Sequence, residues 1–471
     1  MIATRSNPGS RDPRDHPRDH HGAGRAARLL VCSCSCALAL SGCGNATPDR
    51  PTAPISASIS EPAVQPGNRP LAPRIEPAVR VRVLAMDAAK GPWQFGEDGQ
   101  KLLLLDELTR KPSLLDAPIK IGMTAGAWSI QDDADRMLNY PGGGVLSLRT
   151  LGGASDAIEF QDRQLNGKLE LVPRSSAPGQ IDLVTRIPIE QYLPGVLQGE
   201  LYGHWKPSTF AAQAVAARSY AVAEAAFWRP RRHFDLVAGP ASQAWTGMKA
   251  SDRAVEAVEA TRGVVLLFDD RVVPAYYSAS CGGRSASAKQ AISPQEGHLI
   301  KPLEARVNDT VTCCESAPVR SWSLSFNLDL LTPKLRAYGR KLEDDRLSSI
   351  TRLKSVTLVE ANPAGRALRF ELLDHEGQRA RIDAEPFRRL LGTLPRVDGS
   401  PPRALKSADI RTRISGRKLV VTGAGYGHGV GLCQYGAEAM ANEGADWKAI
   451  LARYYPGARP TVAWGDSVAG N

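Results

Sequence analysis

An alanine-rich segment in the middle of the chain constrains the fold more than any other feature. Residues 209–228 read TFAAQAVAARSYAVAEAAFW, and this composition predicts one long helix. Ser208 is expected to cap the N-terminus of this helix, and Pro230 is expected to stop it. The many alanines allow neighbouring backbone to approach closely. We therefore predict a buried helix at the centre of the fold.

The residues before this helix have a different pattern of apolar and polar side chains. Between 80 and 186, short apolar runs such as VRVRVLAM, LLLLDEL, GVLSLRTL and IDLVTRIPI follow one another, with turn residues between them. Apolar residues that alternate with polar ones over about four to eight positions are typical of strands. We predict a β-rich N-terminal lobe over 80–186, without a periodic helix.

The pattern becomes mixed over residues 187–460. A helix is predicted over 189–201, interrupted so that Pro194 stands in the first turn of a second short helix, and another helix is predicted over 327–340. Strand patterns such as SVTLVEA, ALRFELLD and KLVVTGA alternate with them, and two helices precede a stop at Pro456. The predicted fold class is α+β, with a β-rich lobe, a mixed lobe around the Ala-rich helix, a cleft between them and a tail over 461–471.

The first 79 residues are predicted to be targeting and linking segments. Two arginines precede an apolar stretch over 29–40, which predicts a signal peptide over 1–42. The Leu-Ser-Gly-Cys string that follows is similar to the bacterial lipobox, so Cys43 is the expected lipidation site. A signal peptide that is cut elsewhere is the alternative. Residues 43–79 are rich in Pro, Ala and Ser and predict a tether. No later apolar run approaches the roughly 20 residues that span a bilayer.

The charge and the cysteines narrow the function classes. The formal net charge is +10, and +7 remains after residues 1–42, but no Lys/Arg block with interleaved aromatic residues occurs. Nucleic acid is therefore not an expected partner. Three cysteines lie in the signal peptide, which leaves Cys281, Cys313, Cys314 and Cys433 beside Cys43. In an oxidising exported compartment these four are disulfide candidates first.

Glycine recurs at every second position from Gly423 to Gly431. The third glycine of the dinucleotide fingerprint is missing and no Gly-Lys-Ser/Thr follows, so neither phosphate-binding motif fits. Alternating glycines leave a bare backbone ribbon that a carbohydrate or peptide chain could approach, with Tyr426 and His428 as its large side chains. A tightly packed strand with a structural His428 is the alternative. The spacing alone leaves both open.

Glu200 is the candidate for acid–base chemistry. It ends an apolar helix face formed by Val196, Leu197 and Leu201, and it follows Gly199. A carboxyl that is partly removed from water is easier to keep protonated, and a general acid that protonates a glycosidic oxygen needs this property. A solvated Glu at a helix end is the alternative, and the pattern alone favours it.

Several separated strings resemble the stage II sporulation protein D / amidase enhancer family, also called SpoIID/LytB. They are IPIEQYLPGVLQGEL, FAAQAVAARSYAVA, FDLVAGPASQAWTG, AYYSASCGGRSASA and GYGHGVGLCQYGAEAMANEG, and they occur in the family's order between about residues 80 and 460. The resemblance implies lytic cleavage of peptidoglycan glycan strands, best on strands stripped of stem peptides. It also implies that Glu200 is the catalytic acid, because Gly-Glu-Leu matches the family's catalytic block.

The matched strings suggest residues for the substrate as well. Gln243 and Trp245 could hydrogen-bond to a sugar and stack on it, although a buried Trp is as often a core residue. The further substrate-binding candidates in these strings are Tyr426, His428, Gln434 and Ser280. Some members of the family have a His in a His-Ser-Thr-Ser-Gly-Gly string and bind zinc near the catalytic Glu.

That zinc-binding His is missing here, where the string reads Ser-Ala-Ser-Cys-Gly-Gly from residue 278. The cysteines also lack the short Cys-x2-Cys spacing of a strong zinc motif. We therefore expect no metal and no cofactor, and a disulfide bridge from Cys281 to Cys313 or Cys314.

The resulting functional hypothesis is a lipid-anchored lytic transglycosylase of the cell envelope, on the periplasmic side of the outer membrane if the cell has two membranes. Glu200 would act alone, since no convincing second acid is found and hydrolysis normally uses a pair of carboxylates. The product would carry a 1,6-anhydro-muramic acid end. Two alternatives remain: a peptidoglycan-binding protein that stimulates a cell-wall amidase, and a structural envelope lipoprotein.

Overall fold

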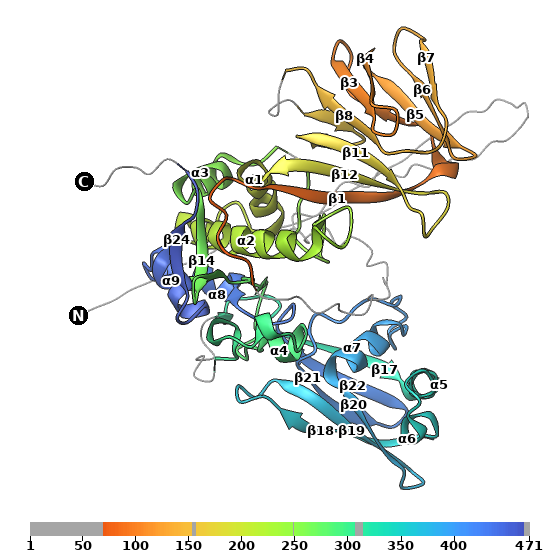
Figure 1. Ribbon diagram of the computed structural model, residues 1–471. Helices are drawn as coiled ribbons and strands as arrows, with labels where there is room; N and C mark the ends of the chain where they lie inside the picture. The colour runs from red at the N-terminus through yellow and green to blue at the C-terminus, as the bar shows by residue number, and fades with distance from the viewer. Residues whose placement is uncertain (1–68, 153–156, 248, 307–313, 466–471) are drawn as a thin grey trace, which may run out of the picture. The chain divides into compact units, whose positions relative to one another are not determined.

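The computed structural model describes residues 69–152, 157–247, 249–306 and 314–465 (Figure 1). The predicted signal peptide, Cys43 and most of the predicted tether lie outside these residues. For residues 69–79 the tether prediction is wrong, because these residues form hydrogen bonds with the folded part of the chain. Arg69 Nη1 donates to the carbonyl oxygen of Phe268 at 2.8 Å. The amide of Val272 donates to the carbonyl oxygen of Pro70 at 2.8 Å.

The N-terminal region is built from strands, as predicted, with one short 3-10 helix, η1 (Ala88–Lys90). The strands are β1 (Ala78–Asp87), β2 (Trp93–Phe95), β3 (Lys101–Asp106), β4 (Lys111–Asp116), β5 (Ile119–Thr124), β6 (Ala127–Gln131), β7 (Met137–Tyr140), β8 (Leu146–Thr150), β9 (Ile158–Phe160), β10 (Arg163–Leu165), β11 (Lys168–Pro173) and β12 (Gln180–Pro188). One sheet has the order β13-β1-β12-β11-β8-β3-β4, where β13 is Leu236–Val237, and a second has the order β2-β5-β6-β7.

The alternation in β1 explains how this sheet joins the rest of the chain. Val79, Val81 and Val83 are buried, and the arginines between them are only partly buried. Strand β1 pairs antiparallel with β12, whose last residue precedes the first helix, and parallel with β13, which follows the second helix. The β-rich region therefore holds both ends of the helical segment 189–235.

Helices α1 (Ile189–Glu200) and α2 (Pro207–Trp228) follow β12 directly. The predicted interruption of α1 is wrong: the helix is continuous with Pro194 inside it. One helical hydrogen bond is lost at a proline, and burial of Tyr192, Leu193, Val196 and Leu197 compensates for it.

The Ala-rich helix α2 is buried, as predicted, at every residue from Thr209 to Ala223. The predicted Ser208 cap is wrong, because Pro207 is the first helical residue and Lys206 stands at the N-cap. Glu438 supplies the missing acceptor from outside the helix. Its Oε2 accepts from the amide of Lys206 at 3.0 Å and from Thr209 Oγ1 at 2.7 Å.

The remaining elements around α2 are α3 (Asp252–Ala260), β14 (Val264–Phe268), β15 (Arg271–Val272), β16 (Tyr277–Ser278), α4 (Ala288–Ala291), η2 (Glu296–His298), η3 (Lys301–Leu303), β23 (Leu432–Cys433), α8 (Gln434–Asn442), α9 (Trp447–Tyr454) and β24 (Arg459–Val462). Strands β15, β14 and β24 form a small sheet, and β16 pairs in parallel with β23. Thus the C-terminal residues return to pack beside α2.

A separate core lies within the region that we predicted to be one mixed lobe. Its elements are β17 (Ser321–Asn327), α5 (Leu328–Lys341), α6 (Asp345–Ser348), β18 (Leu353–Ala361), β19 (Ala367–Asp374), β20 (Arg379–Asp383), α7 (Ala384–Gly392), β21 (Ile410–Ser415) and β22 (Lys418–Ala424). Helix α5 confirms the helix predicted over 327–340. Buried residues from Phe326 to Val421 pack with one another, apart from the larger core that includes α2 and the β-rich sheets.

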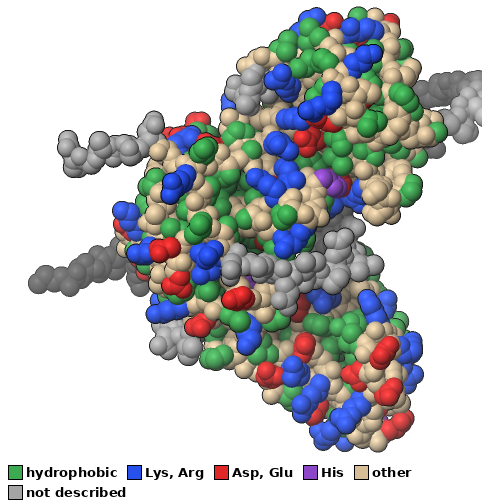
Figure 2. Space-filling view, viewed as in Figure 1, with side chains coloured by type: hydrophobic (Ala, Val, Ile, Leu, Met, Phe, Trp, Pro, Cys, Tyr) green, Lys and Arg blue, Asp and Glu red, His purple; other side chains and the backbone are tan. Residues whose placement is uncertain are grey.

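These elements confirm the α+β fold class. Within the described residues, no helix has both the length and the apolar character that a membrane span requires. Figure 2 shows Lys and Arg side chains interspersed with Asp and Glu over the viewed face, without a continuous basic band. This distribution agrees with the absence of a basic block in the sequence.

Candidate functional site

The carboxyl of Glu200, the last residue of α1, is held by donors from three other parts of the chain. Its Oε1 accepts from the backbone amide of Ala244 at 2.8 Å and from the Tyr277 hydroxyl at 3.4 Å. Its Oε2 accepts from Gln434 Nε2 at 3.1 Å, at the start of α8. The carboxyl is therefore fixed in orientation, and Glu200 remains partly exposed.

Two glycines of α1 allow the segment around Ala244 to approach so closely. A Cβ atom at Gly199 would overlap the carbonyl oxygen of Ala244, and one at Gly195 would lie 2.7 Å from Trp245 Nε1. Any larger residue at position 199 would push the 244 segment away from the helix. Gly199 is thus the local reason that the Ala244 amide reaches Glu200.

A hydrogen-bonded chain of buried side chains leads to the Tyr277 hydroxyl. Tyr192 donates to Gln243 Oε1 at 3.2 Å, and Gln243 Nε2 lies 3.1 Å from the Tyr277 oxygen. Burial, and then the nearby Glu200, raise the pKa of both tyrosines well above its usual value, so both keep their protons. The Tyr277 hydroxyl therefore accepts from Gln243 and donates to Glu200.

This arrangement changes the interpretation of Gln243 and Trp245. Gln243 is fully buried and its amide is bonded to Tyr192, Tyr277 and the Ala217 carbonyl, so it orients Tyr277 rather than facing a sugar. Trp245 is 6% exposed and packs against Tyr192, with 5.9 Å between ring centroids. The core alternative for Trp245 fits this structure. The contact of Tyr277 with Glu200 was not predicted, because the two residues are 77 positions apart.

The glycine-rich segment is packed against protein, so of the two alternatives the tight-packing one fits. A Cβ at Gly431 would overlap the Tyr276 carbonyl oxygen, and one at Gly427 would lie 2.6 Å from the Cβ of Ser278. Both glycines have positive φ angles, of 65° and 102°. The segment therefore leaves no bare ribbon for a ligand along its side that faces β16.

Ser280 and Tyr426 belong to this packed contact. Their backbones exchange hydrogen bonds of 2.8 and 3.1 Å, and the Ser280 side chain is fully buried, where it accepts from the amide of Gly282. Ser280 thus stabilises the turn in this structure instead of facing a ligand. Tyr426 is partly exposed, and its proposed contact with substrate remains a prediction.

His428 is a neutral imidazole within this segment. Its Nδ1 accepts from the amide of Val430 at 3.0 Å. Burial, and then the positive charge of Arg366, lower the pKa of His428 to about 4. The side chain therefore carries no charge at neutral pH.

A cavity of about 550 Å³ adjoins these residues, and Tyr276, Tyr277, Glu224, Trp228 and His428 are among those that line it. Tyr277 thus contributes to the wall of this cavity and also contacts Glu200. Trp228 Nε1 donates to Glu224 at 2.9 Å, while burial raises the pKa of that carboxyl. A volume of this size is in the range of small-ligand pockets.

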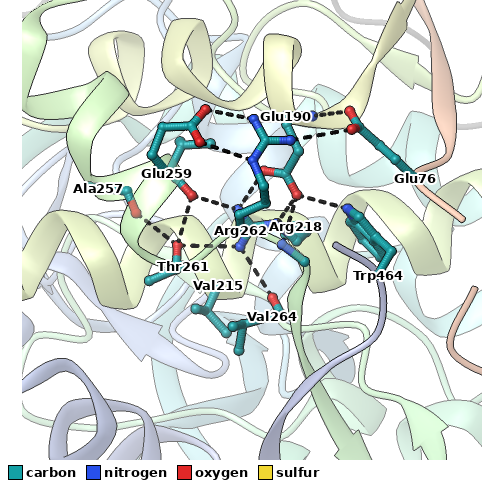
Figure 3. Close-up of polar contacts among 12 residues, drawn as sticks. Glu76, Glu190, Val215, Arg218, Ala257, Glu259, Thr261, Arg262, Val264 and Trp464 are labelled. Atoms are coloured by element: carbon teal, nitrogen blue, oxygen red, sulfur yellow. Dashed lines mark hydrogen bonds and ion pairs between the residues drawn. The ribbon is translucent and has the colours of Figure 1, made fainter. Parts of the chain in front are cut away.

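Glu190, an acid in the same helix as Glu200, is committed to a buried ion pair (Figure 3). Arg218 donates to its two oxygens at 3.0 and 2.7 Å, and the amide of Gly263 and Trp464 Nε1 add bonds of 3.0 and 3.1 Å. Arg218 is thus a buried cation with a structural role. Glu190 therefore has a structural role, because these partners occupy both of its oxygen atoms.

The structure bears on one of the two predicted disulfide pairings, Cys281 with Cys314. Cys281, Cys314 and Cys433 are buried, and the Sγ atoms of Cys281 and Cys314 lie 3.9 Å apart, whereas a disulfide bond is about 2.05 Å long. The Cys281–Cys314 bridge is thus not formed here. Cys313 lies outside the described residues. The three Sγ atoms are all within 4.8 Å of one another, a spacing that suits the thiolate ligands of a zinc ion.

Comparisons with known proteins agree with the resemblance. A family model described as "Stage II sporulation protein" matches residues 177–268, which include Glu200 and Gln243. An uncharacterized protein of Brachyspira hyodysenteriae is 28% identical over 315 residues, covering 67% of this chain and 77% of that protein. The amidase enhancer of Bacillus subtilis is 26% identical over 298 residues, covering 56% of this chain and 39% of that protein. The stage II sporulation protein D of the same organism is 26% identical over 295 residues, covering 59% and 76%.

Proposed function

The chain belongs to the stage II sporulation protein D / amidase enhancer family, and from this premise we propose that it is a lytic enzyme of the bacterial cell wall. The proposed substrate is the glycan strand of peptidoglycan. The bond cleaved joins N-acetylmuramic acid to N-acetylglucosamine, and the product ends in 1,6-anhydro-muramic acid. The observation that carries the proposal is the partly exposed carboxyl of Glu200, which is oriented by donors from separate segments of the chain, among them Ala244, Tyr277 and Gln434.

In the first step, Glu200 gives a proton to the glycosidic oxygen, and the bond from that oxygen to the anomeric carbon breaks. The Ala244 amide and Gln434 hold the carboxyl in place without a charge of their own. Such fixed donors also stabilise the carboxylate that forms when the proton leaves. Tyr277 adds a third donor.

In the second step, the Glu200 carboxylate accepts the proton of the muramyl 6-hydroxyl, whose oxygen closes on the anomeric carbon. The proton that was given is thereby recovered, and no water is consumed. Hydrolysis would need a second carboxylate to activate water. Glu190 does not fit this task because Arg218, Gly263 and Trp464 already surround its oxygens.

The cavity that Tyr277 lines supports binding of a sugar unit, and the Tyr277 hydroxyl links its wall to Glu200, which is not itself a lining residue. Aromatic side chains suit stacking on a sugar, and those in its lining include Tyr276, Tyr277 and Trp228, beside the neutral His428. A lipid anchor at Cys43 would hold the enzyme at a membrane of the envelope.

The test compares two Glu→Gln variants of the full chain, purified in detergent. Glu200→Gln keeps the shape and hydrogen-bonding capacity of the side chain but cannot give a proton, so turnover should fall by at least about 10²–10⁴-fold. Glu443→Gln makes the same change at an exposed helix end and should retain full activity. Glycan strands with and without stem peptides serve as substrates, and mass spectrometry identifies the new ends.

Anhydro ends that depend on Glu200 support the proposal, and greater turnover of peptide-free strands defines the substrate. Reducing ends would instead indicate hydrolysis and a missed second acid. In that case Glu224→Gln, which alters the carboxyl in the cavity, should also remove activity. Full activity of Glu200→Gln would refute the assignment.

The similarity to an amidase enhancer favours a second candidate function, in which the chain binds peptidoglycan and stimulates a separate cell-wall amidase. That function needs the folded surface but no acid. Glu200→Gln would then stimulate an added amidase as well as the parent does, and neither protein would release anhydro ends.

A further inference from the structure

We propose that Cys281, Cys314 and Cys433 together bind one thiophilic divalent cation, Zn²⁺. The three residues come from distant parts of the chain: the turn after β16, the segment before β17, and β23. Their side chains converge in the protein interior, with residue exposures of 1%, 0% and 1%. Metal binding at this site does not require that Glu200 carry out the reaction proposed above.

The spacing of the sulfur atoms fits a metal better than a disulfide. Zn–S bonds of about 2.3 Å at tetrahedral angles place neighbouring sulfur atoms about 3.8 Å apart. The Cys281 and Cys314 Sγ atoms are 3.9 Å apart, and all three lie within 4.8 Å of one another. A disulfide would use two of the three sulfur atoms and bring them to about 2.05 Å.

The backbone supports the thiolate form of one ligand. The amide of Cys281 donates to Cys433 Sγ at 3.4 Å. In metal sites, backbone amides that are not themselves ligands commonly donate hydrogen bonds to the ligand sulfur atoms. These bonds orient the sulfur and stabilise its negative charge. A neutral thiol in an apolar core gains less from such a donor.

A buried cation supplies the charge balance. Three thiolates and one Zn²⁺ carry a net charge of −1, since each thiol releases its proton on binding. The Arg366 guanidinium, in a residue only 3% exposed, donates to the carbonyls of Cys281 at 3.4 Å, Arg284 at 3.0 Å and Gly427 at 3.1 Å.

Buried charges are costly unless an opposite charge is near. In the part of the chain that the structure describes, no carboxylate forms an ion pair with Arg366. Asp409, an acid near it, is paired with Arg284 at 2.7 Å and with Arg411 at 3.2 Å. An anionic metal centre beside Cys281 accounts for the position of this cation.

The cysteine site adjoins the residues that donate hydrogen bonds to Glu200. Cys433 precedes Gln434, and it pairs through β23 with Ser278 of β16, the neighbour of Tyr277. A metal ion bound to these sulfur atoms would tie together the two strands that carry the Tyr277 and Gln434 donors. Its role is therefore to position them and not to take part in the chemistry.

The test measures metal and thiols in the full chain, purified in detergent without chelators. Elemental analysis should find one zinc per chain, and the three thiols should resist alkylation until a chelator removes the metal. Replacing zinc by Co²⁺ should produce the charge-transfer absorption of thiolate ligands. These readouts do not depend on turnover, so they remain valid even if the Glu200 proposal fails.

Cys433→Ser should lower the bound zinc to well below one per chain. Ser278→Ala, which alters a buried hydroxyl on the paired strand, should leave the zinc content unchanged. A metal-free parent protein would overturn the proposal, whether mass spectrometry finds a Cys281–Cys314 disulfide or three alkylated thiols. The measurement on the parent protein is decisive by itself if a variant fails to fold.

Discussion

Replacing Glu190 by Gln would leave the Arg218 guanidinium without a counter-charge in the core. The two side chains are 2% and 0% exposed, and the carboxylate accepts two bonds from Arg218, one from Gly263 and one from Trp464 (Figure 3). Breaking one partner of a buried pair costs about 3–5 kcal/mol, because the other charge stays buried. In addition, the side-chain NH2 group of Gln would face N–H groups that now donate to the carboxylate, so that donor would meet donor. We therefore expect a loss of about 3–5 kcal/mol in the free energy of unfolding.

Urea unfolding followed by tryptophan fluorescence measures this loss, since Trp464 contacts Glu190. Glu259→Gln is the matched control, because Glu259 is an exposed partner of Arg262 on the neighbouring helix, with the atoms 2.6 Å apart. Exposed pairs contribute about 0–1 kcal/mol. Replacing Glu190 and Arg218 together by Leu should cost less than Glu190→Gln alone. Equal small losses in Glu190→Gln and Glu259→Gln would refute the reasoning.

Two further predictions concern the site. Gly199→Ala should lower glycan cleavage strongly, because its Cβ would overlap the Ala244 carbonyl and displace the amide that holds Glu200, whereas Gly203→Ala, which meets no atom within 4 Å, should leave cleavage unchanged. Equal activities of the two variants, with circular dichroism to check folding, would contradict this. The stability should also fall at acid pH, because the pKa of His428 is lowered to about 4 by burial and by Arg366. The contribution of His428 to the free energy of unfolding is complete above about pH 6.5, the pKa of His in the unfolded chain. It is lost as the pH falls toward 4, by about 3 kcal/mol in all. His428→Asn should flatten the urea-derived stability profile over that range, and an unchanged slope would argue against a neutral imidazole in the folded state.

The local structure was largely predictable, because it depends on residues that are near in sequence. The alternation of β1 and the alanine content of α2 predict their elements and their burial correctly. The errors lie at boundaries. The continuity of α1 through Pro194 depends on packing. The start of α2 at Pro207 depends on Glu438, which accepts a hydrogen bond from the Thr209 hydroxyl although 229 positions separate the two residues.

The sequence singled out Glu200 through its helix face and the family resemblance, but it did not reveal the residues that hold the carboxyl. Ala244, Tyr277 and Gln434 are 44, 77 and 234 positions away, and no periodicity connects residues so far apart. The same limit explains Gln243, whose burial behind Tyr277 is not visible in the Ser-Gln-Ala-Trp string. Its proposed sugar contact came from residue type alone.

The glycines and the cysteines show most clearly what tertiary structure decided. Spacing left the glycine segment open to two interpretations, and the choice depends on backbone from residues 276–282 that packs against it. For the cysteines, spacing argued against a metal motif, yet the fold brings Cys433 beside Cys281, although 152 positions separate them. Local patterns record the preferences of neighbouring residues, whereas a site is made by contacts that form only when distant segments pack into one core.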